Sequence, residues 1–316
     1  MTDTDTKKTF VGLLFAFLAT MCWASNYPVN RLIFNAAGNV ELDELWASWI
    51  KFFLGAVVLL PVSITAKNGS WGMFRKEWKQ DWKMFLFLCV CIVCEGVLCF
   101  ISLKYTTSAR SSLMANTSPV FTLLFSVLAA REMLNKRKVI GILLGLAGII
   151  LAATSKGGDM FSDGISMIWG DLLALSSGIF WALFTVFGGV VASRYNGVFC
   201  TTFYRIGGLL LLLPLLWIAD SNITLNLPFA VWCGLFYTSI FSGGIAVWLW
   251  SIAQKHIEPG ILGTFGYMSA FCATAFSLIF LREKLTWNFV LAFIFIIVGM
   301  TLVIKRQKAS DADEAH

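Results

Sequence analysis

The chain has 316 residues, of which 58% are hydrophobic and 13% charged, and its formal net charge is +6 at pH 7. The surface of a soluble domain carries about twice that share of charge, and one soluble core could not enclose 28 Phe and 13 Trp. The composition therefore excludes a water-soluble globular protein. It indicates a chain whose apolar side chains face the hydrocarbon of a bilayer.

Ten apolar stretches of 17 or more residues with hardly a charge recur along the chain. As helices they are long enough to cross about 30 Å of hydrocarbon. They are longer than the strands of a membrane barrel and lack the alternation of such strands. The predicted fold class is therefore an all-α integral membrane protein with ten transmembrane helices. The stretches cover residues 10–33, 45–65, 82–103, 107–130, 138–155, 167–193, 198–219, 228–252, 260–281 and 286–304.

Lys and Arg are distributed unevenly between the two sides of the predicted bundle. With the N-terminus inside, sixteen of them fall on the cytoplasmic side and five on the other. Such a bias is typical of membrane proteins whose basic loops stay inside. We therefore expect a multi-pass protein of the cell inner (plasma) membrane with both termini in the cytoplasm. The net positive charge follows from this topology and gives no sign of nucleic-acid binding.

A charged turn occurs twice in the sequence. Residues 130–135 read AREMLN and residues 281–286 read LREKLT, at an offset of 151. Each half then holds five spans, and because five is odd, the second half must enter the bilayer from the opposite side. Two inverted repeats suit alternating access, in which a central site opens to one face or the other. The predicted domains are a first repeat over residues 1–155, a linker over 156–164, a second repeat over 165–305 and a polar cytoplasmic tail over 306–316.

Three segments resemble a known family. Phe100–Ala152, which contains a Ser-Pro-Val in its fourth span and a Glu-x-Leu turn before a Gly-containing span, is similar to the EamA domain of the drug/metabolite transporter superfamily. Gly263–Ile304 resembles the same domain again, and Thr20–Ile33, TMCWASNYPVNRLI, resembles its first helix. The resemblance implies ten helices in two inverted five-helix repeats. It also implies a secondary carrier for small metabolites, often an exporter of amino acids or related compounds.

The chain departs from the family pattern in two ways. Arg131 and Arg282 stand before the glutamates of the two turns, where the family usually has a small residue. Lys51 stands in the second span, where the family commonly has Arg. Both departures concern the substrate more than the fold.

Ionisable residues inside the predicted spans are candidates for a substrate or proton site. Glu95 lies near the middle of span three, where an ionised carboxylate costs several kcal/mol unless it has a partner or water. Lys51 in span two and Arg205 in span seven are its candidate partners, and they fall at corresponding places in the two halves. Two cations so placed suit a substrate that bears a carboxylate, and Glu95 is the candidate for coupling to a proton. The alternatives are a structural ion pair and, for each cation, a side chain that reaches the membrane interface.

Aromatic and amide residues predict the rest of a cavity wall. Asn26 precedes Pro28 in the first span, where a proline-interrupted helix could present polar groups to a ligand; a kink absorbed by packing is the alternative. Trp181 repeats Trp23 at an offset of 158. A facing pair of indoles would give the cavity an apolar wall for aromatic or aliphatic groups.

Further candidates occupy spans four, seven, eight and nine. Asn116 and Tyr267 fall in matching stretches of the two repeats, where small polar residues could contact substrate or simply allow close helix crossing. Tyr204, next to Arg205, and Trp250 are additional lining candidates. The predicted substrate-binding set is Trp23, Asn26, Lys51, Glu95, Asn116, Trp181, Tyr204, Arg205 and Tyr267.

The glutamates of the two charged turns are interpreted as structural. Glu132 and Glu283 fall just before new helices begin, where a carboxylate can accept from free N–H groups. Asn135 and Thr286 are the expected N-caps of those helices. His256 is expected in a loop, and Gly141 and Gly145 form a small face that predicts close helix packing.

Nothing in the sequence points to an enzyme. The chain has two His, no paired-carboxylate motif and no Gly-rich phosphate loop, and its Cys91-x-x-Cys94 lies inside an apolar span. We expect no metal and no cofactor, a small-molecule substrate, and the lipid bilayer as the main partner; the oligomeric state is left open. The rival hypotheses are a membrane-embedded enzyme that acts on a lipid or metabolite, and a channel or sensor.

Overall fold

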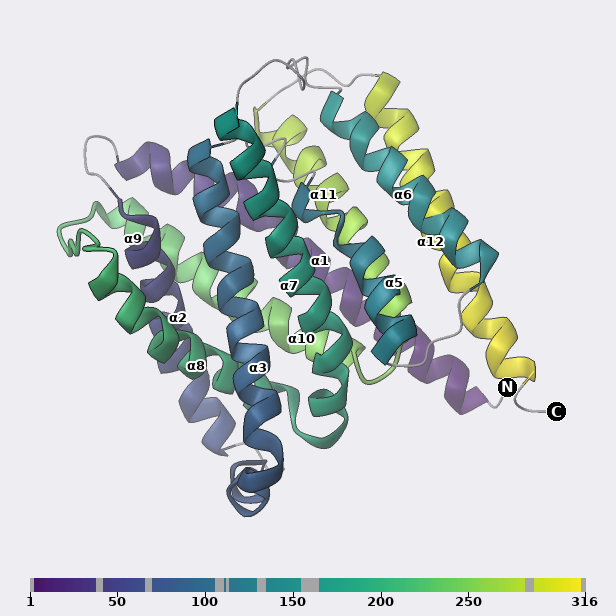
Figure 1. The fold of residues 1–316 in the computed structure, drawn as a ribbon, viewed down its shortest axis with the longest axis horizontal. Helices are drawn as coiled ribbons and strands as arrows, with labels where there is room; N and C mark the ends of the chain where they lie inside the picture. The colour runs from purple at the N-terminus through teal and green to yellow at the C-terminus, as the bar shows by residue number, and fades with distance from the viewer. Residues whose placement is uncertain are drawn as a thin grey trace.

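The computed structural model of the protein describes residues 3–37, 42–65, 70–105, 111, 114–129, 135–154, 165–281 and 287–313. Helices make up almost all of these residues (Figure 1). In chain order they are α1 (Asp3–Ala37), α2 (Glu44–Thr65), α3 (Ser70–Tyr105), α5 (Ser118–Ala129), α6 (Lys136–Thr154), α7 (Ile165–Arg194), α8 (Gly197–Ile218), α9 (Phe229–Tyr237), the π-helix η1 (Thr238–Ile245), α10 (Ala246–Ala253), α11 (Pro259–Leu281) and α12 (Trp287–Asp313).

Six of the described helical stretches are long and apolar enough to cross a membrane, and the one in the second half formed by α9, η1 and α10 counts as a single stretch. They run over Lys8–Ser25, Leu45–Thr65, Lys79–Cys99, Ile168–Arg194, Gly197–Ile218 and Phe229–Ala253. The apolar parts of α5 and α12 are shorter. Large side chains such as Trp217, Phe229 and Trp287 are 86%, 83% and 82% exposed. That exposure fits a surface that faces lipid and its interface rather than water.

Helices from the first half of the chain pack mainly on helices from the second half. α2 lies on α8, α3 on α7, α6 on α12, and α5 on both α7 and α11. α1 crosses the bundle and packs on α9, η1, α10 and α11. Figure 1 shows α6 and α12 side by side along one edge, and the start of α1 near the end of α12. In this view, the start of α1 and the end of α12 lie at the same side of the bundle.

Glycines bring α6 into close contact with α12 and α11. A Cβ atom added to Gly141 would lie 2.6 Å from the carbonyl oxygen of Gly299 on α12, and one added to Gly145 would lie 2.3 Å from the ring of Tyr267 on α11. Because such distances are far below van der Waals contact, only glycine fits at either position. The packing role predicted for Gly141 and Gly145 is confirmed.

α5 and α11 cross closely at the matching polar stretches. A Cβ atom on Gly263 would lie 2.9 Å from the Thr122 side chain, and one on Gly266 would lie 3.5 Å from the Ser118 hydroxyl. The close crossing that the sequence left open is thus present. Contact of these stretches with substrate stays a prediction.

Two local expectations meet the structure differently. Asn135 caps α6, since its Oδ1 accepts from the Arg137 backbone N–H at 3.0 Å, whereas Thr286 and both turn glutamates lie outside the described residues. The helix α1 is continuous from Asp3 to Ala37, so Pro28 does not divide it into two helices, and the alternative of a kink absorbed by packing stays open. α1 packs on four other helical segments.

A polar cluster ties the start of α3 to the loop between α7 and α8. We call it the α3 clasp and define it as Glu77, Asp81, Arg194, Tyr195 and Lys255. Asp81 accepts from Arg194 at 2.6 Å and from the Tyr195 hydroxyl, and Arg194 also pairs with Glu77. Lys255 donates to the Tyr195 carbonyl at 2.8 Å. Burial and the hydrogen bond to Asp81 raise the pKa of the Tyr195 phenol, so this group remains a donor at neutral pH.

Asp81→Asn is expected to lower the free energy of unfolding by about 1–3 kcal/mol, because the buried Tyr195 hydroxyl and the partly exposed Arg194 guanidinium lose their charged acceptor. The matched control is Glu77→Gln. Its pair with Arg194 is 36% exposed on both sides, so we expect about 0–1 kcal/mol there. The melting temperatures of the purified variants in detergent measure the difference. Equal melting temperatures for the two variants would contradict the assignment of Asp81 as the centre of the clasp.

Candidate functional site

Arg205 on α8 is a buried cation with an unusual environment. Its side chain is 7% exposed, and its Nε donates to the Gly243 carbonyl at 2.9 Å. The guanidinium carbon lies 4.8 Å from the ring centre of Phe52, in cation–π geometry. Among the described residues, neither Nη1 nor Nη2 has a hydrogen-bond partner. Four N–H groups on the outer edge of the guanidinium therefore make no hydrogen bond within the described part of the chain.

Lys51 and Glu95 share the electrostatic environment of Arg205. The charge of Arg205 interacts favourably with Glu95 on α3 and unfavourably with Lys51 on α2. Both side chains are partly buried. If all three groups are ionised, they sum to one positive charge inside the bundle, which a single carboxylate would balance. The structure therefore brings the three predicted charged residues into one electrostatic group.

The π-helical turn η1 is the part of the site that the sequence did not predict. The Ala246 N–H donates to the carbonyl of Phe241, five residues back, as in a π-helix, and such turns inside α-helices are frequent at functional sites. Ser239 in this turn donates to the Lys51 carbonyl at 2.7 Å. The Ser242 carbonyl accepts from the Trp23 indole at 3.0 Å. One turn therefore contacts α1, α2 and α8. The only sequence signal is the Ser-Gly-Gly run at 242–244 in an otherwise apolar span.

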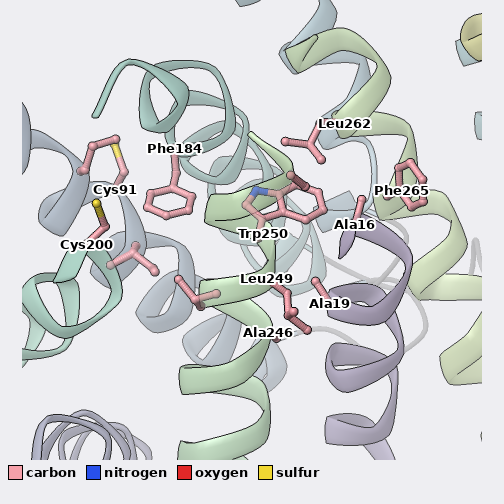
Figure 2. Close-up of a cluster of buried hydrophobic side chains, with 14 of the residues drawn as sticks. Ala16, Ala19, Cys91, Phe184, Cys200, Ala246, Leu249, Trp250, Leu262 and Phe265 are labelled. Carbon is pink, nitrogen blue, oxygen red and sulfur yellow. The ribbon is translucent and has the colours of Figure 1, made fainter. Parts of the chain in front are cut away.

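Three indoles from three helices meet beside this turn. The ring centres of Trp23 and Trp181 are 4.9 Å apart, and Trp250 lies 5.0 Å from the first and 5.5 Å from the second. Figure 2 shows Trp250 at the centre of the buried cluster, between Phe184 and the small side chains of α1. The contact between Trp23 and Trp181 expected from the repeat is present. Trp250, which is 1% exposed, packs against both of them.

The remaining predicted residues are spread more widely. Tyr204 is buried, and its ring centre lies 5.2 Å from that of Phe184, which in turn stacks on Trp181. Asn116 is buried in the turn before α5. This turn lies close to α7, because the carbonyl oxygen of Ala115 would be 2.7 Å from a Cβ atom on Gly178, three residues before Trp181. Tyr267 packs into the α6 side of the bundle and donates to the Ile142 carbonyl at 3.2 Å. The side chain of Asn26 lies outside the described residues. Whether these four contact a substrate stays a prediction.

No group of three or more His, Cys, Asp or Glu in the described part of the chain has the arrangement of a metal site. His256 lies in the turn after α10, as expected for a loop residue. Burial and the charges of Lys255 and Lys8 lower its pKa. The imidazole is therefore neutral at neutral pH.

The comparison with protein families agrees with this arrangement of helices. The sequence model of the EamA-like transporter family matches residues 10–154 and again residues 168–305. The chain belongs to this family. The resemblance noted in the sequence is confirmed, and the family points to a transporter rather than an enzyme. This EamA-like transporter is a multi-pass membrane protein with a small-molecule substrate.

Relatives of this EamA-like transporter extend along the whole chain. An uncharacterized transporter from Archaeoglobus fulgidus is 27% identical over 301 residues, which cover 93% of this chain and 97% of that protein. The uncharacterized transporter YvbV from Bacillus subtilis is 28% identical over 309 residues, with 96% and 95% covered. A crystal structure of a protein with 20% sequence identity matches 94% of this chain and 96% of its own with a TM-score of 0.77. The last comparison concerns the fold alone.

Proposed function

We propose that the protein is a secondary transporter of small amphiphilic metabolites that carry a carboxylate, such as amino acids and related compounds. The substrate binds near the middle of the membrane and is exposed to either side by alternating access. We further propose that it works as an exporter in the cell inner membrane. In this proposal both termini lie in the cytoplasm, an orientation that the distribution of basic residues favours. The observation that carries the proposal is the buried guanidinium of Arg205, whose Nη1 and Nη2 have no hydrogen-bond partner within the described part of the chain.

The packing of the helices supports ten spans in two inverted five-helix repeats. In such a repeat, each element of the first half corresponds to one of the second: α1 to α7, α2 to α8, α3 to the α9–η1–α10 segment, α5 to α11, and α6 to α12. Contacts between non-corresponding elements should then occur twice, and they do: α3 packs on α7 as α10 packs on α1, and α5 packs on α7 as α11 packs on α1. The corresponding elements α2 and α8, α5 and α11, and α6 and α12 also pack on each other. The family also matches the two halves separately, close to the proposed boundaries 1–155 and 165–305. A bundle of two related halves can rock between two packings around a central site.

The carboxylate of the substrate is assigned to Arg205. A guanidinium presents its N–H groups in a planar fork that fits a carboxylate with two parallel hydrogen bonds. In a buried position such a pair replaces the missing water, and the additional charge of Lys51 favours an anion. The three indoles, Trp23, Trp181 and Trp250, supply the apolar wall for the rest of the molecule.

Glu95 is proposed to couple transport to a proton. Its carboxylate and that of the substrate both interact with Arg205, so protonation of Glu95 would release Arg205 for the substrate. Glu95→Gln mimics the protonated form and is expected to bind substrate while the transport rate loses its dependence on pH. Initial rates in proteoliposomes over a series of pH values measure this. An unchanged pH profile would remove the coupling role from Glu95.

Counterflow in proteoliposomes tests the transporter itself. Vesicles loaded with unlabelled L-phenylalanine or L-leucine are expected to accumulate the labelled compound, with saturable rates and no chemical change. A channel would give flux without saturation or counterflow, and an enzyme would give a new product by mass spectrometry. A comparison of metabolite efflux from cells with and without the protein would then establish direction and natural substrate.

A further inference from the structure

We propose that the π-helical turn η1 positions the substrate-binding guanidinium, with Gly243 as the positioning residue that makes the site selective for a planar carboxylate over its neutral amide. This inference rests on the proposed function, because it concerns how Arg205 is held and not whether the protein transports. It adds a role for residues 238–245, which otherwise only complete the span between α9 and α10.

The turn reaches three other helices by hydrogen bonds to its backbone and side chains. Two successive carbonyls, those of Ser242 and Gly243, accept from Trp23 and Arg205. Hydrogen bonds in a π-helix reach one residue further than in an α-helix, so where the two helix types join, a carbonyl is left for a partner outside the helix. Ser239, three residues earlier, bonds to the backbone of Lys51. The turn therefore fixes the positions of Arg205, Trp23 and the Lys51 backbone relative to one another.

Gly243 is required by the position of the guanidinium. A Cβ atom at Gly243 would lie 2.1 Å from Nη2, 2.4 Å from Cζ and 2.7 Å from Nη1 of Arg205. The guanidinium therefore lies directly over the glycine and could not stay there beside any other residue. The neighbouring Gly244 is different, because a Cβ there would find its nearest atom, in Leu59, at 3.5 Å. That is an ordinary van der Waals contact.

The orientation has a chemical consequence. With Nε bonded to Gly243 and one face of the group against Phe52, rotation of the guanidinium is blocked and the Nη edge faces one direction. A carboxylate matches that edge with two acceptor oxygens. A carboxamide offers one acceptor and turns an N–H₂ donor towards a donor, so it loses both a bond and the charge attraction. A loosely held Arg205 would still attract anions but would discriminate less by shape.

A second glycine crowded against Arg205 allows an independent test from another helix. A Cβ atom on Gly55 of α2 would lie 2.8 Å from Arg205 Cδ and 3.3 Å from the Ser239 hydroxyl. Gly55→Ala and Gly243→Ala therefore displace the same side chain from two different helices. Gly244→Ala adds the same methyl group to the same turn without touching Arg205.

The experiment measures binding of L-phenylalanine and of L-phenylalaninamide to the full-length protein purified in detergent, by competition with tritiated L-phenylalanine. The wild type and Gly244→Ala are expected to prefer the carboxylate at least about tenfold. In Gly243→Ala and Gly55→Ala the preference should fall towards one, mainly through weaker binding of L-phenylalanine. Size-exclusion profiles and melting temperatures show which variants are folded.

The outcomes separate the two proposals. If a folded Gly243→Ala or Gly55→Ala keeps the wild-type preference, the positioning role is overturned while the carboxylate anchor stands. An equal loss in Gly244→Ala also overturns it, since the effect would then belong to the turn in general. If the wild type binds neither probe, or both equally, the proposed function and the positioning role fall together.

Discussion

Arg205→Met is expected to weaken binding of a carboxylate substrate at least about 30-fold and to stop measurable counterflow. Truncating one partner of a buried, hydrogen-bonded charge pair typically costs about 2–5 kcal/mol. Methionine keeps much of the apolar stem that packs beside Gly55, so the change removes the charge and the fork with little loss of volume. Glu95 would then lack the cation with which it interacts. Competition binding with labelled L-phenylalanine and counterflow in proteoliposomes measure the two effects.

Two further variants separate charge from geometry. Arg205→Lys keeps the positive charge but has no Nε for Gly243 and no planar fork, so it should recover only a small part of the affinity. Lys51→Met removes a second cation, which interacts electrostatically with Arg205. We expect a smaller loss of substrate affinity than for Arg205→Met. Normal affinity in both Arg205→Met and Lys51→Met would remove the carboxylate anchor from the proposed function.

The parts of the site that follow the repeat could be predicted from the sequence. Trp181 was paired with Trp23 by an offset alone, and the two rings are in contact. Arg205 and Lys51 fall at corresponding places in the two halves, and they share one electrostatic environment. Asn135 was expected as an N-cap because an Asn before an apolar helix has a local reason to be there, and it caps α6. Both the internal repeat and the helix cap can be recognised from the order of residues alone.

Features that depend on which helices touch could not be predicted in this way. The π-helical turn has the same hydropathy as an α-helix, so no periodicity reveals the shift from four to five residues between bonded groups. The ring of Tyr267 lies in the space that Gly145 leaves on a neighbouring helix, a contact for which the sequence gives no signal. In the α3 clasp, Arg194 bonds to Asp81 and Glu77 of α3, which lie 113 and 117 positions earlier in the chain. Neither partner of such a pair signals the other until the helices are placed.

Gly141→Leu is expected to reduce the free energy of unfolding by about 3 kcal/mol or more, the upper range for inserting side-chain atoms into a packed contact. The reason is specific to backbone contact. The nearest atom to a new Cβ is the Gly299 carbonyl oxygen at 2.6 Å, and a backbone atom cannot rotate away as a side chain can. A Cβ on Gly299 meets the Gly141 carbonyl at 2.4 Å in turn, so the two helices must separate along the seam that joins the two halves of the chain.

Gly96→Leu is the matched control for this seam, because a Cβ atom at Gly96 on α3 has no neighbour within 4 Å among the residues that the structure describes. Leucine is the better helix former by about 1 kcal/mol at most, so the control should melt at or slightly above the wild-type temperature. Thermal unfolding of both variants in the same detergent gives the comparison. A Gly141→Leu protein that melts with Gly96→Leu would mean that α6 and α12 do not need their close contact.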